Sequence, residues 1–356
     1  DSKKGLLKVD REGNVWIGTV SGISKYGKAI FEHFTDNHGL YGNNILAVSA
    51  NREDDVWVST YNGLMHYDGE QFETYKNLND IYCIYNSGSE KVVFGSNQSI
   101  YVFNNGQFTQ YKDTSLFTGF DDYVHGIQPG KDNSYWLATD KGLVKFQNGV
   151  FKQIAIDSLK AKSIEVCDNA VWVSTGNGVY HYHPSSERIH SIKVEDGLPN
   201  NNCRDLTPAK DCGVWVGTDN GLVHINADHN LKIYNAEKGM HSNSIYLVQR
   251  DKEGAIWAGH EKGIEKIIPK TGEISHYGPR EGFYPLETNE GAVSLDEEGN
   301  LWLGTVDGLV KYVPENDRIN EMPPQTYIRS IKLFDKTTDF SEYADSTDIA
   351  TNLPVD

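Results

Sequence analysis

The stretch DREGNVWIGTVSGISKY at Asp10–Tyr26 returns almost unchanged as DEEGNLWLGTVDGLVKY at Asp296–Tyr312. Related phrases recur between the two about every forty residues, a period typical of propeller blades or helical arrays. The eight copies begin at Asn14, Asp55, Lys91, Ser134, Ala170, Gly213, Ala255 and Asn300. Every tryptophan of the chain holds the same place in its copy, and we assign Phe94 to that place in the remaining one: Trp16, Trp57, Trp136, Trp172, Trp215, Trp257 and Trp302.

Each copy contains four short runs of the β type. In the second copy they are ILAVSA from Ile45, the tryptophan run, GLMHY from Gly63 and FETY from Phe72. Glycine-containing turns such as DKEG and DNG separate the runs, as tight antiparallel hairpins require. The fourth run keeps an apolar i,i+3 pair from the first copy (Phe31 and Phe34) to the last (Ile319 and Met322). The repeats are therefore hairpin pairs, not helices.

A four-stranded sheet that is apolar on both faces cannot bury itself, but radially arranged sheets bury one another. The sequence thus predicts an all-β fold, a β-propeller of four-stranded antiparallel blades spanning residues 1–323. The eight sets of four β-type runs favour eight blades. The alternative is a seven-bladed ring whose first repeat is the remnant of an upstream ring. The tryptophans are expected to wedge between blades, because one indole buries roughly 150–250 Å².

The repeat motifs resemble those of a known family. The order G-L/M-x-x-N, then D-x-x-G-N-(V/L)-W, then G-(L/I)-x-K/H-Y is similar to the two-component regulator propeller repeat of Bacteroidetes sensor proteins. Its first part is matched at Gly39–Ile45, Gly197–Cys203 and Gly239–Ile245. The resemblance implies an extracytoplasmic sensor module that binds a ligand and passes the signal to a histidine kinase.

The segment after the repeats extends this resemblance. PPQTYIRSIKLFDK at Pro323–Lys336 resembles the opening strand of the immunoglobulin-like domain that follows such propellers, so residues 324–356 are expected to begin that domain or to form an extended tail. In the family a transmembrane helix and a kinase come later. The resemblance therefore implies a periplasmic location, membrane attachment only through segments beyond this chain, no enzyme activity in this part, and homodimerisation of the full-length sensor.

Composition excludes some partners. The formal net charge is −17 and the sequence pI about 5.1, without any run of lysine or arginine, which argues against nucleic acid or an anionic membrane surface. The four cysteines, Cys83, Cys167, Cys203 and Cys212, show no CxxC pair. They are expected to be free thiols, because an even number alone does not indicate disulfides in a chain of this length.

No motif indicates a metal, a cofactor or a catalytic site. The acidic turns lack the alternating carboxylates of a calcium loop and are explained as hairpin turns. His181 and His183 share one face of a strand and could ligate a metal, but the sequence points to no third or fourth ligand. Nucleophile-elbow, zinc-protease and phosphate-loop motifs are all missing from the sequence.

Loops on one face of the ring are the expected ligand site, because loops on rigid scaffolds commonly carry function. They place aromatic rings beside amides and histidine, a combination that suits the apolar C–H faces and hydroxyls of a neutral oligosaccharide. The structural alternative is that the asparagines cap turns and the aromatic rings pack between loops. The candidate residues are Tyr41, Asn43, Tyr61, Tyr123, Asn201, His260, Tyr284 and Asn289.

Three functions remain open at this point. A carbohydrate-sensing module is preferred, as the resemblance implies. A propeller enzyme, either a lyase or a glycosidase, would need convergent acid and base groups in the channel. A protein-interaction platform would need a broad apolar patch on one face.

Overall fold

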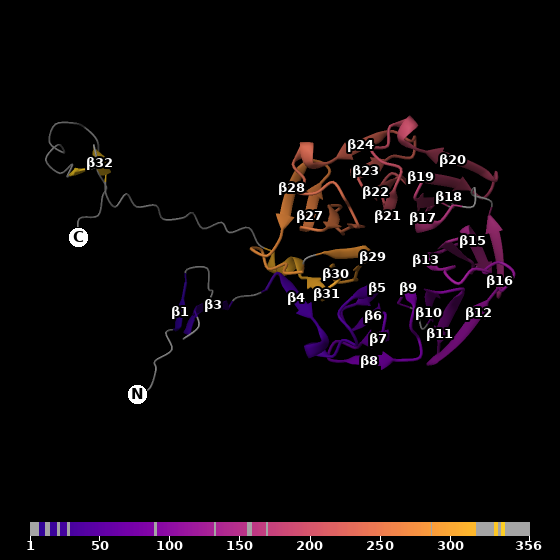
Figure 1. Ribbon diagram of the computed structural model, residues 1–356, viewed down its shortest axis with the longest axis horizontal. Helices are drawn as coiled ribbons and strands as arrows, with labels where there is room; N and C mark the ends of the chain where they lie inside the picture. The colour runs from indigo at the N-terminus through magenta and orange to yellow at the C-terminus, as the bar shows by residue number, and fades with distance from the viewer. Residues whose placement is uncertain are drawn as a thin grey trace. The chain divides into compact units, whose positions relative to one another are not determined.

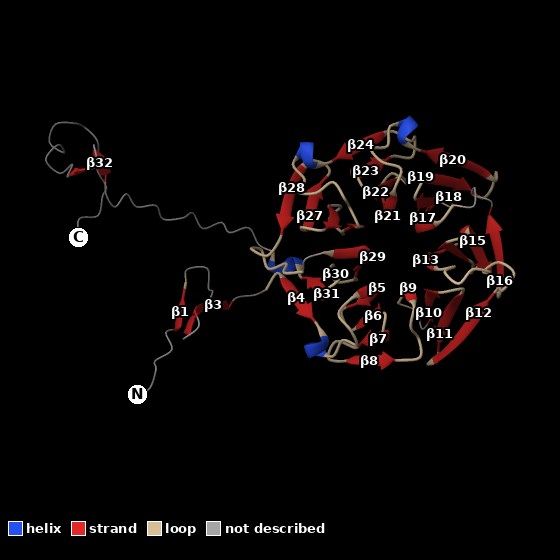
Figure 2. Cartoon of the chain, in the orientation of Figure 1, coloured by secondary structure: helices blue, strands red, loops and turns tan. Residues whose placement is uncertain are grey.

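The computed structural model describes residues 7–10, 15–19, 22–26, 29–88, 91–131, 133–154, 159–168, 170–285, 287–317, 331–333 and 336–338. Within these ranges, seven four-stranded antiparallel sheets stand around a central axis (Figure 1), which confirms the all-β propeller fold. The described residues also form four short 3-10 helices between strands (Figure 2): η1 (Asp36–His38), η2 (Val194–Asp196), η3 (Ala236–Lys238) and η4 (Pro314–Asn316).

Each blade runs from an inner strand next to the axis to an outer strand at the rim. Blade one is β5 (Ile45–Arg52), β6 (Asp55–Thr60), β7 (Gly63–Tyr67) and β8 (Phe72–Tyr75). Blade two is β9 (Ile81–Asn86), β10 (Lys91–Ser96), β11 (Ser99–Asn104) and β12 (Gln107–Lys112). Blade three is β13 (Val124–Pro129), β14 (Tyr135–Thr139), β15 (Gly142–Gln147) and β16 (Val150–Ile154). Blade four is β17 (Ala161–Cys167), β18 (Ala170–Thr175), β19 (Gly178–His183) and β20 (Arg188–Ile192).

The remaining blades follow the same order until the ring closes. Blade five is β21 (Cys203–Pro208), β22 (Val214–Thr218), β23 (Gly221–Ile225) and β24 (Leu231–Tyr234). Blade six is β25 (Leu247–Arg250), β26 (Ile256–His260), β27 (Gly263–Ile268) and β28 (Glu273–Tyr277). Blade seven takes β29 (Thr288–Leu295), β30 (Leu301–Thr305) and β31 (Gly308–Tyr312) from the last repeat and its outer strand, β4 (Phe31–Phe34), from the first.

This closure corrects the preferred count of eight blades to seven. The run containing Phe31 and Phe34 belongs to the first repeat by sequence, yet it pairs antiparallel with β31, placing Phe31 opposite Tyr312. The ring therefore extends from Phe31 to Tyr312, not from residue 1. Ile319 and Met322, the expected fourth run of the last repeat, lie outside the described residues.

The rest of the first repeat forms a sheet of its own. Strands β1 (Leu7–Val9), β2 (Val15–Thr19) and β3 (Gly22–Tyr26) make three antiparallel strands in a unit separate from the ring. Leu7, Val9 and Ile23 are exposed. This exposure agrees with the alternative prediction, in which the first repeat is a remnant blade and so leaves an apolar face uncovered.

At the C-terminal end, β32 (Ile331–Leu333) and β33 (Lys336–Thr338) form a two-stranded antiparallel pair. The rest of residues 324–356 lies outside the described residues, so the immunoglobulin-like beginning stays a prediction.

The tryptophans of the ring are buried between blades, as expected, but Phe94 does not hold their position. Each of these tryptophans pairs with the residue three places after the start of the third strand, for example Trp57 with His66. In blade two that partner, Val102, pairs with Val93. Phe94 therefore faces the preceding blade, where its ring lies edge-on 5.1 Å from that of Trp57. The assignment of Phe94 to the tryptophan place is off by one residue.

The cysteines also differ from expectation. Cys167, at the end of β17, and Cys212, in the turn before β22, form a disulfide with a Cα–Cα distance of 5.4 Å. Cys83 and Cys203 are free and buried. The prediction of four free thiols is therefore wrong. The two cysteines are 45 residues apart in sequence, but the repeat places the first hairpins of neighbouring blades side by side, so the end of β17 meets the turn before β22.

The acidic turns serve the hairpins, as predicted. Asp251 accepts a hydrogen bond from the amide of Ala255 at 2.8 Å and another from the indole of Trp257 at 2.9 Å. Asp296 does the same for Asn300 and Trp302. These carboxylates anchor the tryptophan and the turn at once.

Candidate functional site

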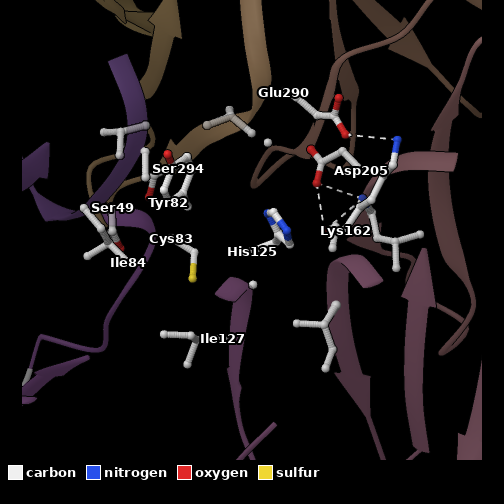
Figure 3. Close-up of a pocket in the computed structure, with 18 of the residues that line it drawn as sticks. Ser49, Tyr82, Cys83, Ile84, His125, Ile127, Lys162, Asp205, Glu290 and Ser294 are labelled. Atoms are coloured by element: carbon white, nitrogen blue, oxygen red, sulfur yellow. Dashed lines mark hydrogen bonds and ion pairs between the residues drawn. The ribbon is translucent and has the colours of Figure 1, made fainter. Parts of the chain in front are cut away.

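A cavity of about 860 Å³ lies along the axis of the ring, lined by residues from all seven inner strands. Figure 3 shows Lys162, Asp205 and Glu290 on one side of it, Ser49, Tyr82 and Ser294 on the other, and His125 between them. Apolar side chains such as Ile84, Ile127 and Ile164 also line it. Its volume is in the range typical of small-molecule sites.

Four polar residues at one end of the cavity share a single position in the repeat. In each of their blades the first residue of the inner strand pairs with the last residue of the second strand: Ile81 with Ser96, Val124 with Thr139, Ala161 with Thr175, and Cys203 with Thr218. The shared position is the second residue of the inner strand. These second residues are Tyr82, His125, Lys162 and Arg204. We call this end of the cavity, formed by these four residues with Tyr61, Asp140, Lys160, Asn289 and Glu290, the channel mouth.

Ion pairs cross one half of the channel mouth. Arg204 Nε lies 2.6 Å from Asp219 and its Nη1 lies 2.8 Å from Glu290. Lys162 donates to Asn202 at 2.8 Å and pairs with Glu290 at 3.6 Å. The guanidinium group of Arg204 also lies over the ring of Tyr246, 5.0 Å from the ring centroid.

A second group surrounds Asp140 in the turn between β14 and β15. Its carboxylate accepts from His125 Nε2 at 3.1 Å and from the amide of Tyr123 at 2.8 Å, and pairs with Lys160 at 3.0 Å. Burial acts to raise the pKa of Asp140, but the hydrogen bonds and the charge of His125 prevail and lower it to about 2. Each cation of the channel mouth is thus matched by a carboxylate, so this region carries little net charge within an acidic chain.

Two carboxyl groups occupy deeper positions. Asp205 accepts hydrogen bonds from Ser163 and from the amides of Leu206 and Val248, and so connects blades four, five and six. Burial nevertheless raises its pKa to about 6. Burial, and then the charge of Asp205, raise the pKa of Glu165 to about 8.

Among the predicted site residues, Tyr61 and Asn289 line the cavity. Tyr61 is 57% exposed. Asn289 donates to Asn44 Oδ1 at 2.8 Å. Tyr123 does not line the cavity, but its ring lies 4.6 Å from that of the channel-mouth residue Tyr82.

Two of the predicted asparagines are turn caps. Asn43 accepts from the amide of Asp36 at 2.8 Å, and Asn201 accepts from the amide of Val194 at the same distance. Asn243 makes the equivalent bond to Ala236. Because one bond recurs in three connections, the structural explanation of these residues holds.

The other three candidates lie away from the cavity. The backbone of Tyr41 bonds Met65 and Thr60 in blade one, and Tyr284 packs against His33 at a ring distance of 5.1 Å. His260 is fully buried in blade six, where its Nδ1 accepts from the amide of Lys262. The loops therefore supply only part of the predicted cluster.

Tyr82, His125, Lys162 and Arg204 were not among the candidates. Each is the second residue of an inner strand, in a run that the sequence assigns to the fold. The available signal is that one repeat position, next to a small or apolar buried residue, is polar or aromatic in four successive copies.

His181 and His183, the weighed metal pair, belong to a larger histidine cluster. His181 Nδ1 lies 3.0 Å from His229 Nε2, and the rings of His190 and His229 stack at 4.3 Å. Burial and the neighbouring histidines lower the pKa of His181 to about 3.

Comparison with solved structures places the fold. The structure is similar to the extracellular domain of BT3049 from B. thetaiotaomicron, described as a hybrid two component system, with a TM-score of 0.78 and 20% identity over 95% of this chain and 50% of that chain. It is also similar to the extracellular domain of BT4673 from the same organism, described as a one component system (TM-score 0.68, 18% identity, 94% and 49% coverage).

Propellers of other functions share the fold more distantly. Virginiamycin B lyase from Staphylococcus aureus, solved as a catalytically inactive variant with quinupristin, matches with a TM-score of 0.66 and 14% identity over 79% of this chain and 98% of that one. No protein-family model and no curated protein matches the chain. The expected resemblance to sensor propellers is confirmed at the level of the fold, and this chain spans about half the length of the two extracellular domains.

Among the described residues, no helix has the length and apolar composition needed to cross a bilayer.

Proposed function

We propose that this chain is the extracytoplasmic sensor module of a two-component signalling protein and that it binds a neutral oligosaccharide at the channel mouth. The observation that carries the proposal is the composition of the cavity. Tyr61 and Tyr82 offer ring faces, while Lys162, Arg204 and Glu290 offer donors and acceptors already held in place by one another.

The charge balance favours a neutral ligand over an anionic one. Lys160, Lys162 and Arg204 each have a carboxylate partner, so a phosphate or carboxylate ligand would have to displace an existing pair. Sugar hydroxyls can instead both donate to and accept from such groups, because a paired side chain keeps unused hydrogen-bonding capacity.

The disulfide supports a location outside the cytoplasm. Disulfides persist in oxidising compartments such as the bacterial periplasm and are rare in the cytosol. Cys167 and Cys212 are both partly buried and join neighbouring blades, as a structural disulfide does. A periplasmic sensor would pass its signal through downstream segments to a membrane-linked histidine kinase, in a full-length protein that forms a homodimer.

A panel of neutral, acidic and sulfated oligosaccharides, screened by thermal shift and followed by calorimetry, tests this function. A ligand that binds only the native state stabilises it by RT ln(1 + [L]/Kd), so the unfolding temperature rises with ligand concentration and with affinity. We expect a neutral oligosaccharide to give the largest shift. Binding only by acidic glycans, or by none of the panel, would contradict the proposal.

A lyase or glycosidase is the second candidate, favoured by the pair of His125 and Asp140. A carboxylate that orients an imidazole is a common arrangement for a general base. Chromatography of each panel mixture after long incubation separates the two functions, because an enzyme converts the glycan while a sensor returns it unchanged.

A further inference from the structure

A carboxylate is buried in blade six where the other blades of the ring carry apolar or tyrosine side chains. Glu265 on β27 is 0% exposed and pairs across the sheet with Ala258. The corresponding residue is Met65 in blade one, Val144 in blade three and Val223 in blade five. The fold therefore does not require an acid here.

Three histidines surround this carboxylate. His241, from the connection between blades five and six, donates from its backbone amide to Glu265 Oε1 at 2.6 Å, and its Nδ1 lies 2.9 Å from the same oxygen. His276 on β28 places Nδ1 4.0 Å from Oε1. His260, at the end of β26, places Nε2 3.7 Å from Oε2.

Several of these atoms have no hydrogen-bond partner in the described part of the chain. They are Glu265 Oε2, His260 Nε2 and His276 Nδ1, all buried and directed into the same small volume. A buried polar atom without a partner is costly, and native proteins normally satisfy such atoms with a protein group, a water or an ion. Here the groups that converge are imidazoles and a carboxylate, the ligands of divalent transition metals.

We propose that His241 Nδ1, Glu265 and His276 Nδ1 form a binding site for a divalent transition metal ion, with zinc the best match to the ligand set. The three ligand atoms lie within 4.8 Å of one another. Tetrahedral zinc with bonds of about 2.1 Å brings its ligand atoms to about 3.4 Å apart. The side chain of His241 is 53% exposed and free to make that adjustment. Its exposed side also gives the ion a path from solvent.

His260 acts as a positioning residue. Its Nδ1 accepts a hydrogen bond from the amide of Lys262 at 3.0 Å, so in the neutral ring the proton is on Nε2, which faces Glu265 Oε2. Nε2 therefore cannot coordinate the ion while this bond stands. The Nε2–H of His260 can instead donate a hydrogen bond to the Glu265 carboxylate that binds the ion. Loss of such a hydrogen bond to a metal ligand typically lowers metal affinity about 10- to 100-fold.

Blade one supplies the matched control. There the amide of Tyr41 donates to Met65 Sδ at 3.0 Å, in the place of the bond from His241 to Glu265. Thr60 and Thr74 occupy the positions of His260 and His276. Glu265→Met, His276→Thr and His260→Thr therefore convert blade six to side chains that this chain already accommodates.

The test is calorimetric titration of the untagged, chelator-treated protein with zinc chloride, together with Co²⁺ absorption spectra and thermal unfolding. We expect one zinc per chain, a rise in unfolding temperature, and a cobalt spectrum of low coordination number. Glu265→Met and His276→Thr should each abolish binding at concentrations that saturate the wild type, and His260→Thr should weaken it about 10- to 100-fold.

His229→Asn, in the separate histidine cluster of blades four and five, should leave binding unchanged. Each variant is checked for a cooperative unfolding transition, so that loss of metal is not mistaken for loss of fold. Zinc binding that survives Glu265→Met but disappears in His229→Asn would assign the ion to the other cluster and overturn the proposal, as would no binding to the folded wild type.

Discussion

Phe34 and Trp302 stack with ring centroids 5.7 Å apart and planes 28° apart. Phe34 comes from the first repeat and Trp302 from the last, so the two ends of the ring meet in one aromatic contact. Tyr67 from blade one touches both rings, at 5.4 Å from Phe34 and 6.1 Å from Trp302. The closure is therefore held by packing between blades as well as by the hydrogen bonds of β4.

Trp302→Ala should lower the free energy of unfolding by about 3–5 kcal/mol, because a fully buried wedge is removed and a cavity remains. Urea denaturation followed by circular dichroism measures the change. Trp16→Ala is the control: this tryptophan has the same place in its repeat but is 38% exposed and lies in the separate three-stranded sheet. We expect it to leave the main transition of the ring unchanged. Equal losses in the two variants would contradict the seven-bladed closure.

The repeat register predicted the fold but not the blade count, for a physical reason. The pairing within each hairpin is local and visible in turn glycines and alternating side chains. Whether the Phe31–Phe34 run completes the first sheet or the last depends on which unpaired strand edge it meets, and both edges have the same sequence pattern. A closed ring leaves no such edge, which favours the pairing with β31.

Alkylation of the denatured, unreduced protein should label Cys83 and Cys203 but not Cys167 or Cys212, as read by mass spectrometry. Cys212→Ser should lower the free energy of unfolding by about 2–4 kcal/mol, since the unfolded chain regains the freedom of a long loop. Cys203→Ser is the control and should keep the disulfide intact. Labelling of all four cysteines would contradict the linkage.

Stability should fall as the pH drops from about 6.5 towards 3, in part because of His181. Its pKa is lowered from 6.5 to about 3 by burial and by His183, His229 and His190, so between these values the unfolded chain binds a proton that the folded chain does not. The loss between pH 7 and pH 5 should reach about 2 kcal/mol.

Urea denaturation at a series of pH values tests this, with His181→Gln expected to flatten the dependence. His224→Gln is the matched control. Its ring stacks on Trp215 at 4.7 Å, in the same register position as His181 on Trp172, but the three neighbouring histidines are absent from its contacts among the described residues. An equal effect of the two substitutions would contradict the assignment to the histidine cluster.

Glu165 should have the opposite effect at higher pH. Its pKa is raised from 4.5 to about 8 by burial and by Asp205, so the folded chain holds a proton that the unfolded chain has released, and this contribution is lost as the pH rises from 4.5 to 8. Glu165→Gln cannot release a proton. Its stability relative to wild type should therefore increase across that window and stay constant above it. A difference that does not change with pH would show that Glu165 is ionised in the folded state.

The candidate site was predicted in part, and its residues show why. Tyr61 was found because it lies in the variable turn between β6 and β7, and Asn289 because the sequence places it at the end of a variable connection, although the structure makes it the second residue of β29. Asn43 and Asn201 lie in similar connections, but they stand at the same place of the repeated G-L/M-x-x-N motif as Asn243, and that recurrence is the sequence sign of a turn cap. Lys162 and Arg204 were missed although their repeat position is polar or aromatic in four successive copies, because the convergence of these positions on one axis appears only in the folded ring.

Tyr61→Ala and Tyr82→Ala should weaken binding of the neutral oligosaccharide by about 1–3 kcal/mol each, because each removes an aromatic face from the channel mouth. Calorimetry measures the affinity and thermal unfolding the stability. Tyr61 is more than half exposed, so its variant should unfold close to the wild-type temperature, whereas Tyr82→Ala should also lose the contact with Tyr123.

Matched controls separate the channel mouth from the outer loops. Tyr41→Ala and Tyr284→Ala remove tyrosines that do not themselves line the cavity and should bind like wild type. Tyr123→Ala should have an intermediate effect through its contact with Tyr82. Trp172→Ala should reduce stability before it affects affinity, because the indole is fully buried between blades. If Tyr41→Ala or Tyr284→Ala weakens binding while Tyr61→Ala does not, the ligand contacts the outer loops and the channel mouth is not its site.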